Sequence, residues 1–429
     1  MKNWIYCEDL LIYIWQLQKF DHSNLKTTDD QTIIIQNKGF RNKDSGPDFE
    51  AAKLIIEDIH WAGTIEMHWF ASDWDLHNHE INKAYDNVIL HVVYEEDKVI
   101  LNKFGKKIPC LSLKNRIPNH IINNSSNLNP DNWIPCEKII HTINDITWSL
   151  WLDRLLIERI EEKSVWINNL LQNTQWNWEE CFYIIISKYF GGTINSIPFE
   201  KLAMQTPYNI MLKNKSDIFV LESILFGQSG LLIENENSDN YTLKLIKEYY
   251  HFKLKHKLKP IENHEWKFLR LRPASFPTIR IAELAAIIHK NGSIFRKVIE
   301  SESLQSIYKI FDIKLSDYWD HHYIFNVPSK TIKKKIGKQE INTLIINAIV
   351  PFLHVYGRQI GNEALVTKSF DLLNSISTEK NSIIKKWQEL GITCENASHS
   401  QALIQLNKKY CQNKKCLSCS IGHSILSSS

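Results

Sequence analysis

The feature that most constrains the fold is a change of pattern near residue 130. Before it, short apolar segments rich in β-branched residues alternate with turns, which is typical of strands. Residues 114–135 are rich in Asn, Pro and Ser and predict a linker. After it, apolar residues recur at helical spacing. We therefore expect an α+β protein of 429 residues, with an α/β mixed-sheet domain over 1–125, a mainly helical domain over 136–390 and a Cys-rich tail over 391–429.

The N-terminal part predicts one helix followed by strands in a defined order. Apolar residues at helical spacing after two acids predict a helix over 8–20. Three strands are predicted over 31–36, 49–57 and 64–70, and a polar segment with a helical turn follows over 72–84. Residues 87–94, NVILHVVY, are apolar enough for a strand buried on both faces. The order is helix, three strands, a short helix or loop, and a central strand.

Acidic candidate ligands lie on two of these strands. Glu66 and His68 are two residues apart on one strand, so both side chains point to the same face. Asp48 opens the preceding strand, and a hairpin would bring it near Glu66. Two buried carboxylates repel each other, and a hard cation such as Mg²⁺ or Mn²⁺ would relieve that repulsion. Alternatively, Glu66 lies on an exposed sheet face and Asp48 only forms a turn.

Histidines form a second set of candidate ligands in the same region. His77 and His79 are separated by one residue, and His91 lies within the apolar strand over 87–94. Together with His68 they make a His-rich cluster, which can hold Zn²⁺, Mn²⁺ or iron. A histidine inside an apolar strand could instead be a hydrogen-bonded core residue, so both interpretations of His91 stay open.

The element order, with Asp48 at the second strand and Glu66 at the third, resembles the PD-(D/E)XK nuclease superfamily over about residues 8–95. The resemblance implies that Asp48 and Glu66 hold Mg²⁺ or Mn²⁺ for cleavage of nucleic-acid phosphodiesters. The chain departs from the pattern at His68, which stands where the superfamily has the Lys that orients the attacking water. The phrases SGPDFEAAKL, WAGTIEMH and SDWDLHNHE also resemble an uncharacterised bacterial family of unknown function, and this similarity covers nearly the whole chain.

The tail concentrates half of the eight cysteines. Cys411, Cys416 and Cys419 are closely spaced, which in a reducing compartment predicts a Zn²⁺ site or an iron–sulfur cluster. Cys394 would complete an all-thiolate site suited to either metal. His423 would instead give three thiolates and one imidazole, which favours Zn²⁺. The alternative is a set of free thiols near the end of the chain.

Basic residues indicate where a nucleic-acid backbone could bind. Arg270, Arg272 and Arg280 surround a Pro-bounded loop and the start of a helix, where they suit phosphate or pair with nearby acids. Lys408 and Lys409 precede the clustered cysteines. The net charge of +3 does not by itself imply a nucleic-acid partner.

No stretch approaches the roughly 20 apolar residues of a membrane span, and the N-terminus lacks a signal-peptide pattern. We therefore expect a cytoplasmic protein without a membrane partner. The favoured function is a divalent-metal-dependent nuclease with Asp48, Glu66 and His68 as catalytic residues. One alternative is a catalytically inactive nuclease-like fold that binds nucleic acid or a protein. The other is a His/carboxylate metalloenzyme that acts on a small substrate.

Overall fold

The computed structural model describes residues 8–428 and divides into two compact units. The first comprises the chain up to Arg154, Lys385–Thr393 and the residues from Leu403 onward. The second comprises Leu155–Ile384 and Cys394–Ala402. Most of the Cys-rich tail thus packs within the sheet-containing unit instead of forming a separate domain, and that unit extends past the expected boundary at residue 125.

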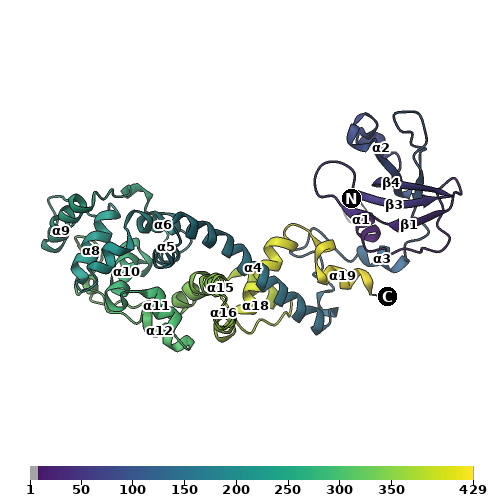
Figure 1. The fold of residues 1–429 in the computed structure, drawn as a ribbon. Helices are drawn as coiled ribbons and strands as arrows, with labels where there is room; N and C mark the ends of the chain where they lie inside the picture. The colour runs from purple at the N-terminus through teal and green to yellow at the C-terminus, as the bar shows by residue number, and fades with distance from the viewer. Residues whose placement is uncertain (1–7, 429) are drawn as a thin grey trace. The chain divides into compact units, whose positions relative to one another are not determined.

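The first unit is built on a mixed sheet with α1 beside it (Figure 1). The strands are ordered β1-β3-β4-β5-β6, and β2 also pairs with β3. β1, β3 and β4 are antiparallel, whereas β5 is parallel to β4 and β6 is parallel to β5. The N-terminal elements are α1 (Glu8–Gln16), β1 (Ile33–Asn37), β2 (Phe40–Arg41), β3 (Phe49–Ile56), β4 (Ile59–Phe70), α2 (Asp73–Leu76), β5 (Val88–Glu95), β6 (Cys110–Ser112) and α3 (Asn119–Ser125). The expected mixed sheet is confirmed.

The hairpin of β3 and β4 determines where the acidic residues lie. Its turn is tight, with Ile56 opposite Ile59, so β4 begins earlier than the strand predicted over 64–70. A register shift follows Phe49, and Ala51 within it has a left-handed φ of 56°. Bulges of this kind re-aim the strand locally. The shift leaves Phe49 opposite Ile65. It therefore brings Asp48, which precedes Phe49, close to Glu66, which follows Ile65.

The connection from β4 to β5 carries two of the candidate histidines. Parallel strands need a crossover, and here α2 and the 3₁₀ turns at His79–Ile81 and Lys83–Tyr85 form it. Trp74 of α2 packs in a core cluster with Val93 of β5 and Ile108. This packing ties the crossover to the sheet and positions the segment between α2 and the first 3₁₀ turn.

The rest of the chain is mainly helical, as the periodicity predicted. α4 (Asp145–Asn173), α17 (Ser382–Glu389) and α18 (Ala397–Gln405) each continue from one unit into the other, and α19 (Ser420–Ser427) belongs to the first. The second unit contains α5 (Trp178–Phe190), α6 (Ser196–Gln205), α7 (Tyr208–Lys213), α8 (Ile218–Gln228), α9 (Asn240–His256), α10 (Pro277–Asn291), α11 (Ile294–Glu300), α12 (Leu304–Phe311), α13 (Tyr318–His321), β7 (His322–Ile324), β8 (Val327–Pro328), α14 (Lys338–Leu344), α15 (Val350–Gln359) and α16 (Glu363–Ser375).

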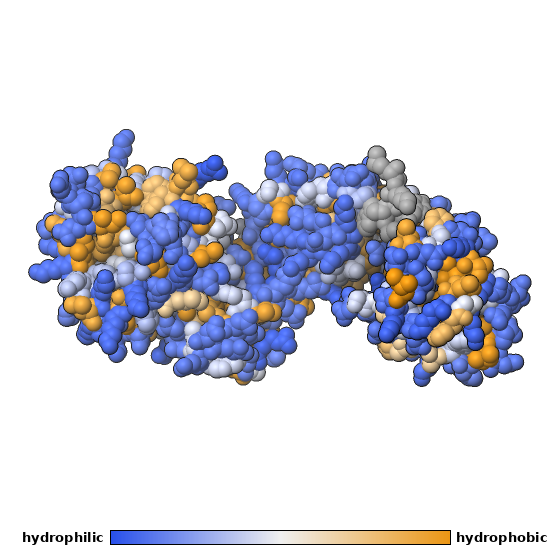
Figure 2. Space-filling view, turned by 90° about the horizontal axis from the view of Figure 1, so that it is seen from above, coloured by the Kyte–Doolittle hydropathy of each residue, from blue (hydrophilic) through white to orange (hydrophobic). Residues whose placement is uncertain are grey.

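The surface in the view of Figure 2 is mostly hydrophilic, with patches of hydrophobic residues on it. Single exposed apolar side chains are normal for folded proteins. Over residues 8–428, no helix combines the length and the apolar character that a bilayer crossing requires.

Candidate metal centre

Asp48 and Glu66 come together where β3 begins. The backbone N–H of Asp48 donates to Glu66 Oε2 at 3.0 Å, and both side chains are buried. Asp48 Oδ2 accepts the N–H of Met67 at 3.1 Å, and Oδ1 accepts the Arg41 guanidinium. Both oxygens of Asp48 are therefore engaged by the protein, whereas Glu66 Oε1 faces the histidines.

The carboxyl groups share a neighbourhood of negative charge. Burial raises the pKa of Glu66, and the charge of Asp48 raises it further. Burial also raises the pKa of Asp48, although the Arg41 guanidinium opposes this shift. Glu8, in the first turn of α1, is a third member of the group, because burial and then the charges of Asp48 and Glu66 raise its pKa to about 8. Sequence reasoning treated Glu8 only as a helix-stabilising acid and missed Arg41.

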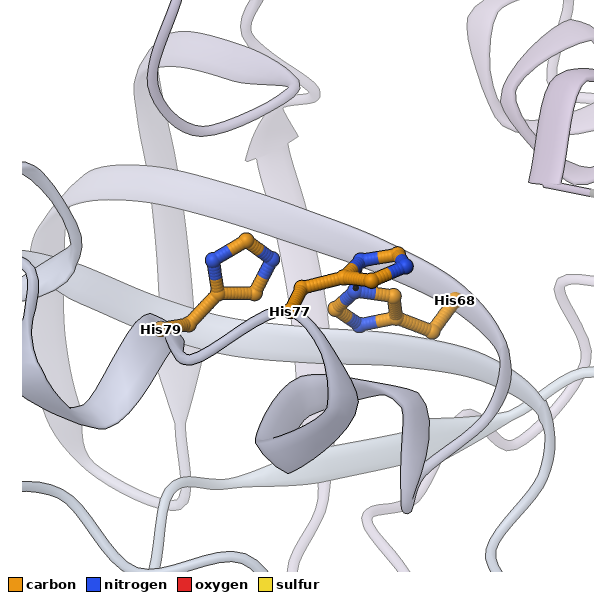
Figure 3. Close-up of side chains that lie close together, drawn as sticks. All are labelled: His68, His77 and His79. Carbon is orange, nitrogen blue, oxygen red and sulfur yellow. Dashed lines mark hydrogen bonds between the residues drawn. The ribbon is translucent and has the colours of Figure 1, made fainter.

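His68, His77 and His79 converge on one point, as Figure 3 shows. One ligand atom of each lies within 4.8 Å of those of the other two. His68 Nε2 is 3.2 Å from His77 Nδ1. Glu66 Oε1 is 3.2 Å from His79 Nε2 and 3.7 Å from His68 Nε2. A strand and a crossover segment thus supply three imidazoles beside one carboxylate oxygen. We call His68, His77 and His79 the histidine trio.

His91 supports this trio from β5. Its Nε2 lies 2.8 Å from His68 Nδ1, so it holds the nitrogen of His68 that faces away from His77. Metal-binding histidines commonly have their second nitrogen held in this way. The Trp74 ring contacts His79 and His91 edge-on, with ring centroids 5.3 Å apart in each pair. His91, a ligand candidate in the sequence, thus lies against His68 and outside the trio whose ligand atoms meet.

The buried imidazoles are in the form that binds metals. Burial, and to a smaller extent the neighbouring imidazoles, lower the pKa of His68 to about 2 and that of His91 to about 3. Burial likewise lowers the pKa of His79. His79 Nε2 is buried without a hydrogen-bond partner, because its 3.2 Å approach to Glu66 lacks the alignment of a bond. Such an unsatisfied nitrogen is costly, and a metal ion would satisfy it.

The donor set fits a transition metal better than Mg²⁺. Imidazole nitrogen is a good ligand for Zn²⁺ or iron, whereas Mg²⁺ prefers oxygen. The oxygens of Asp48 that the sequence-based hypothesis assigned to Mg²⁺ or Mn²⁺ already accept bonds from Arg41 and Met67. His77 is exposed, which leaves a route from solvent to the trio.

The basic residues singled out by the sequence have different surroundings. Arg270 and Arg272 are exposed in the second unit, and Lys408 and Lys409 are exposed in the first. Arg280 departs from the expectation that it binds a nucleic-acid backbone. It is buried, donates to Glu283 at 2.6 Å and also pairs with Glu340. Its guanidinium is therefore part of an internal ion-pair network, because a buried cation needs carboxylate partners.

The cysteines of the tail are divided between the two units. Cys411, Cys416 and Cys419 lie in the first unit, whereas Cys394 lies in the second. Burial raises the pKa of the Cys136 thiol, in the segment before α4, and Cys419 and Cys416 raise it further. No spacing pattern in the sequence connects Cys136 to the tail.

These features define a two-unit α+β protein with a buried His/carboxylate cluster on its mixed sheet. The chain belongs to the family described as Protein of unknown function (DUF2851), whose family model matches residues 8–382. Neither a curated protein nor a solved structure matches the chain. The expected membership in a family of unknown function is confirmed, whereas the resemblance to nucleases stays a prediction.

Proposed function

We propose that the first unit is a metal-dependent hydrolase that cleaves phosphodiester bonds of nucleic acid. The convergence of the histidine trio beside Glu66 carries this proposal. Three imidazoles that leave one coordination position free are a donor set of hydrolytic metal sites. A divalent metal bound there would supply Lewis acidity.

Two further observations support a phosphodiester as the substrate. The observed order of α1, antiparallel strands, α2 and β5 is the order on which the resemblance to nucleases rests, with Asp48 just before the second long strand and Glu66 on the third. Arg41, whose side chain is 27% exposed, lies beside Asp48. Its guanidinium has the geometry to bind a phosphate oxygen.

In the proposed reaction, a water oxygen forms a bond to phosphorus while the bond from phosphorus to one sugar oxygen breaks. The pKa of Glu66 is raised to about 9 in the chain alone, and a cation held by the trio would favour its ionised form. The proton of the water then passes to Glu66 Oε1, which faces the histidines, and the departing sugar oxygen takes a proton from solvent. His91 holds the ring of His68, and Tyr85 stacks on His79 with ring centroids 3.8 Å apart. These contacts preorganise the imidazoles before substrate binds.

A second candidate function is hydrolysis of a small substrate at the same centre. It is favoured because both oxygens of Asp48 already accept hydrogen bonds from the protein. The resemblance to nucleases instead implies that Asp48 and Glu66 together bind a metal ion. In this case the histidine trio and Glu66 keep their roles, and only the substrate differs.

The test combines cleavage with metal binding. Labelled single- and double-stranded DNA and RNA are incubated with the protein and Mn²⁺, Zn²⁺ or Mg²⁺, and Mn²⁺ and Zn²⁺ affinities are measured by calorimetry. His77→Ala and Glu66→Gln are compared with the native chain. His60→Ala is the matched control, because His60 is exposed on the same strand as His68.

We expect both site variants to lose cleavage by about 100-fold or more, in the range of a lost acid–base group. His77→Ala should also weaken metal binding, whereas His60→Ala should change neither. Cleavage that survives both site variants would contradict the proposal. Metal binding without cleavage of any nucleic acid would favour the small-substrate candidate. If the native chain neither binds a metal nor cleaves nucleic acid, the result would favour an inactive fold that binds nucleic acid or a protein.

A further inference from the structure

We propose that a cavity in the second unit binds a small zwitterion, a molecule with one ammonium and one carboxylate group, such as a free amino acid. The cavity has a volume of about 300 Å³ and is lined by residues of α4 and α15. That volume is at the lower end of the range for small-molecule sites. Its polar lining includes Glu161, Asn168, His354 and Arg358, and all of them belong to the second unit. The proposal therefore does not depend on the proposed hydrolase.

His354 is an unusual residue to find on the wall of a cavity. It is 5% exposed, and within residues 8–428 neither of its ring nitrogens has a hydrogen-bond partner. Its ring packs edge-on against Phe370, with the ring centroids 5.7 Å apart. Folded proteins seldom bury polar atoms in this way, because such atoms lose their bonds to water and gain none in exchange. The unpartnered imidazole therefore points to a polar occupant of the cavity.

A second unpartnered group lines the same cavity from α4. Asn168 Oδ1 is buried, and no donor among residues 8–428 bonds to it. Ser164, one turn earlier on α4, donates its hydroxyl to the Ile160 carbonyl at 2.8 Å and so does not donate to Asn168. Residues from two helices thus carry unpartnered polar atoms at one cavity. What these atoms lack is an occupant that both donates and accepts hydrogen bonds.

Two opposite charges line the cavity beside these groups. Glu161 lies on α4, and Arg358 lies on α15 one turn after His354. Both are exposed, and neither forms an ion pair within the described part of the chain. Burial lowers the pKa of His354, Arg358 lowers it further, and Glu161 and Glu363 oppose the shift. The imidazole is therefore neutral and offers one N–H donor and one acceptor.

These groups are complementary to a zwitterion. An ammonium group is a hydrogen-bond donor only, and the Glu161 carboxylate and Asn168 Oδ1 are acceptors for it. A carboxylate accepts the paired N–H groups of the Arg358 guanidinium. A half-turn about χ2 of His354 exchanges its ring nitrogens with ring carbons at little cost, so either side of the ring can meet the ligand. An anion alone would leave Glu161 without a counter-charge, and a cation alone would leave Arg358 without one.

The experiment measures binding of the standard amino acids to the full chain, first by thermal shift and then by calorimetry. The chain is freed of metal beforehand, because amino acids chelate metal ions and would otherwise bind through a metal at the histidine trio. The amino acid that binds most tightly is compared with two derivatives. Its amide lacks the carboxylate, and its N-acetyl form lacks the ammonium group.

Two variants and a matched control locate the binding. Arg358→Gln removes the guanidinium at an exposed position, so the fold should be retained. His354→Phe keeps an aromatic ring but removes both nitrogens. Arg296→Gln is the control, because Arg296 is exposed in the same unit and does not line the cavity. If His354→Phe does not fold, Arg358→Gln decides.

We expect at least one amino acid to raise the melting temperature, and its amide and N-acetyl form to bind at least about 10-fold more weakly. Arg358→Gln and His354→Phe should weaken binding by a similar factor, and Arg296→Gln should leave it unchanged. The proposal is overturned if no amino acid binds the native chain, in which case ordered water is the occupant of the cavity. It is also overturned if both derivatives bind as tightly as the parent, or if Arg358→Gln has no effect.

Discussion

A buried carboxyl group in the second unit leads to a prediction about pH and stability. Glu222 of α8 is fully buried and accepts hydrogen bonds from Tyr241, from Ser316 at 3.0 Å and from Trp319 Nε1 at 3.2 Å. Burial raises its pKa from an ordinary value of 4.5 to about 7, although these hydrogen bonds oppose the shift. The folded chain therefore holds a proton that the unfolded chain releases.

The sign and size of the effect follow from this pKa difference. Between pH 4.5 and about 7 the folded state binds the extra proton, so the free energy of unfolding falls as the pH rises through this window. The difference of 7 − 4.5 = 2.5 pKa units corresponds to about 3 kcal/mol, at 1.36 kcal/mol for each unit. Above the folded pKa the contribution is constant. Glu222→Gln retains the shape of the neutral side chain and removes this pH dependence.

The assay is urea unfolding of the native chain and of Glu222→Gln at several pH values between about 4.5 and 8. The stability of the variant relative to the native chain should rise by about 3 kcal/mol across this range. Taking the difference cancels other titrating groups, including Glu283, whose pKa burial also raises to about 7. Glu236→Gln is the control, because Glu236 is exposed, and it should show no such trend. A Glu222→Gln difference that stays constant with pH would refute the reasoning.

Two further predictions test packing and an ion pair. Gly227→Ala would place a Cβ 2.0 Å from the Tyr249 ring, so thermal unfolding should show a loss of about 1–3 kcal/mol; an unchanged melting temperature would contradict this. Arg280→Met leaves Glu283 buried without its cation and should cost about 3–5 kcal/mol in urea unfolding, unless the carboxyl group protonates at low pH.

Local patterns predicted much of the fold. The helix expected over 8–20 has the same first residue as α1, and the mainly helical part after the linker is confirmed, because apolar periodicity acts over short distances. The strand expected over 87–94 differs from β5 by one residue at each end. The strand predicted over 64–70 begins earlier in the structure, at Ile59. The sequence of a tight turn does not indicate how many residues next to it pair between the two strands.

The candidate site was predicted less completely. Residue types and spacing singled out Asp48, Glu66 and His68, and the structure brings the first two together. The role of His91 could not be decided from the sequence, because a histidine in an apolar strand can be either a ligand or a support. Only the register of β4 and β5, with Glu66 opposite His91, placed it behind His68.

The sequence by itself determined the change from strands to helices, the residue types available for metal binding and the membership of a family over residues 8–382. The tertiary structure alone decided which of those residues meet. The crossover after β4 brings the histidine trio together beside Glu66. The physical reason is that periodicity reports contacts within one helix or strand, whereas a ligand set depends on how distant segments pack.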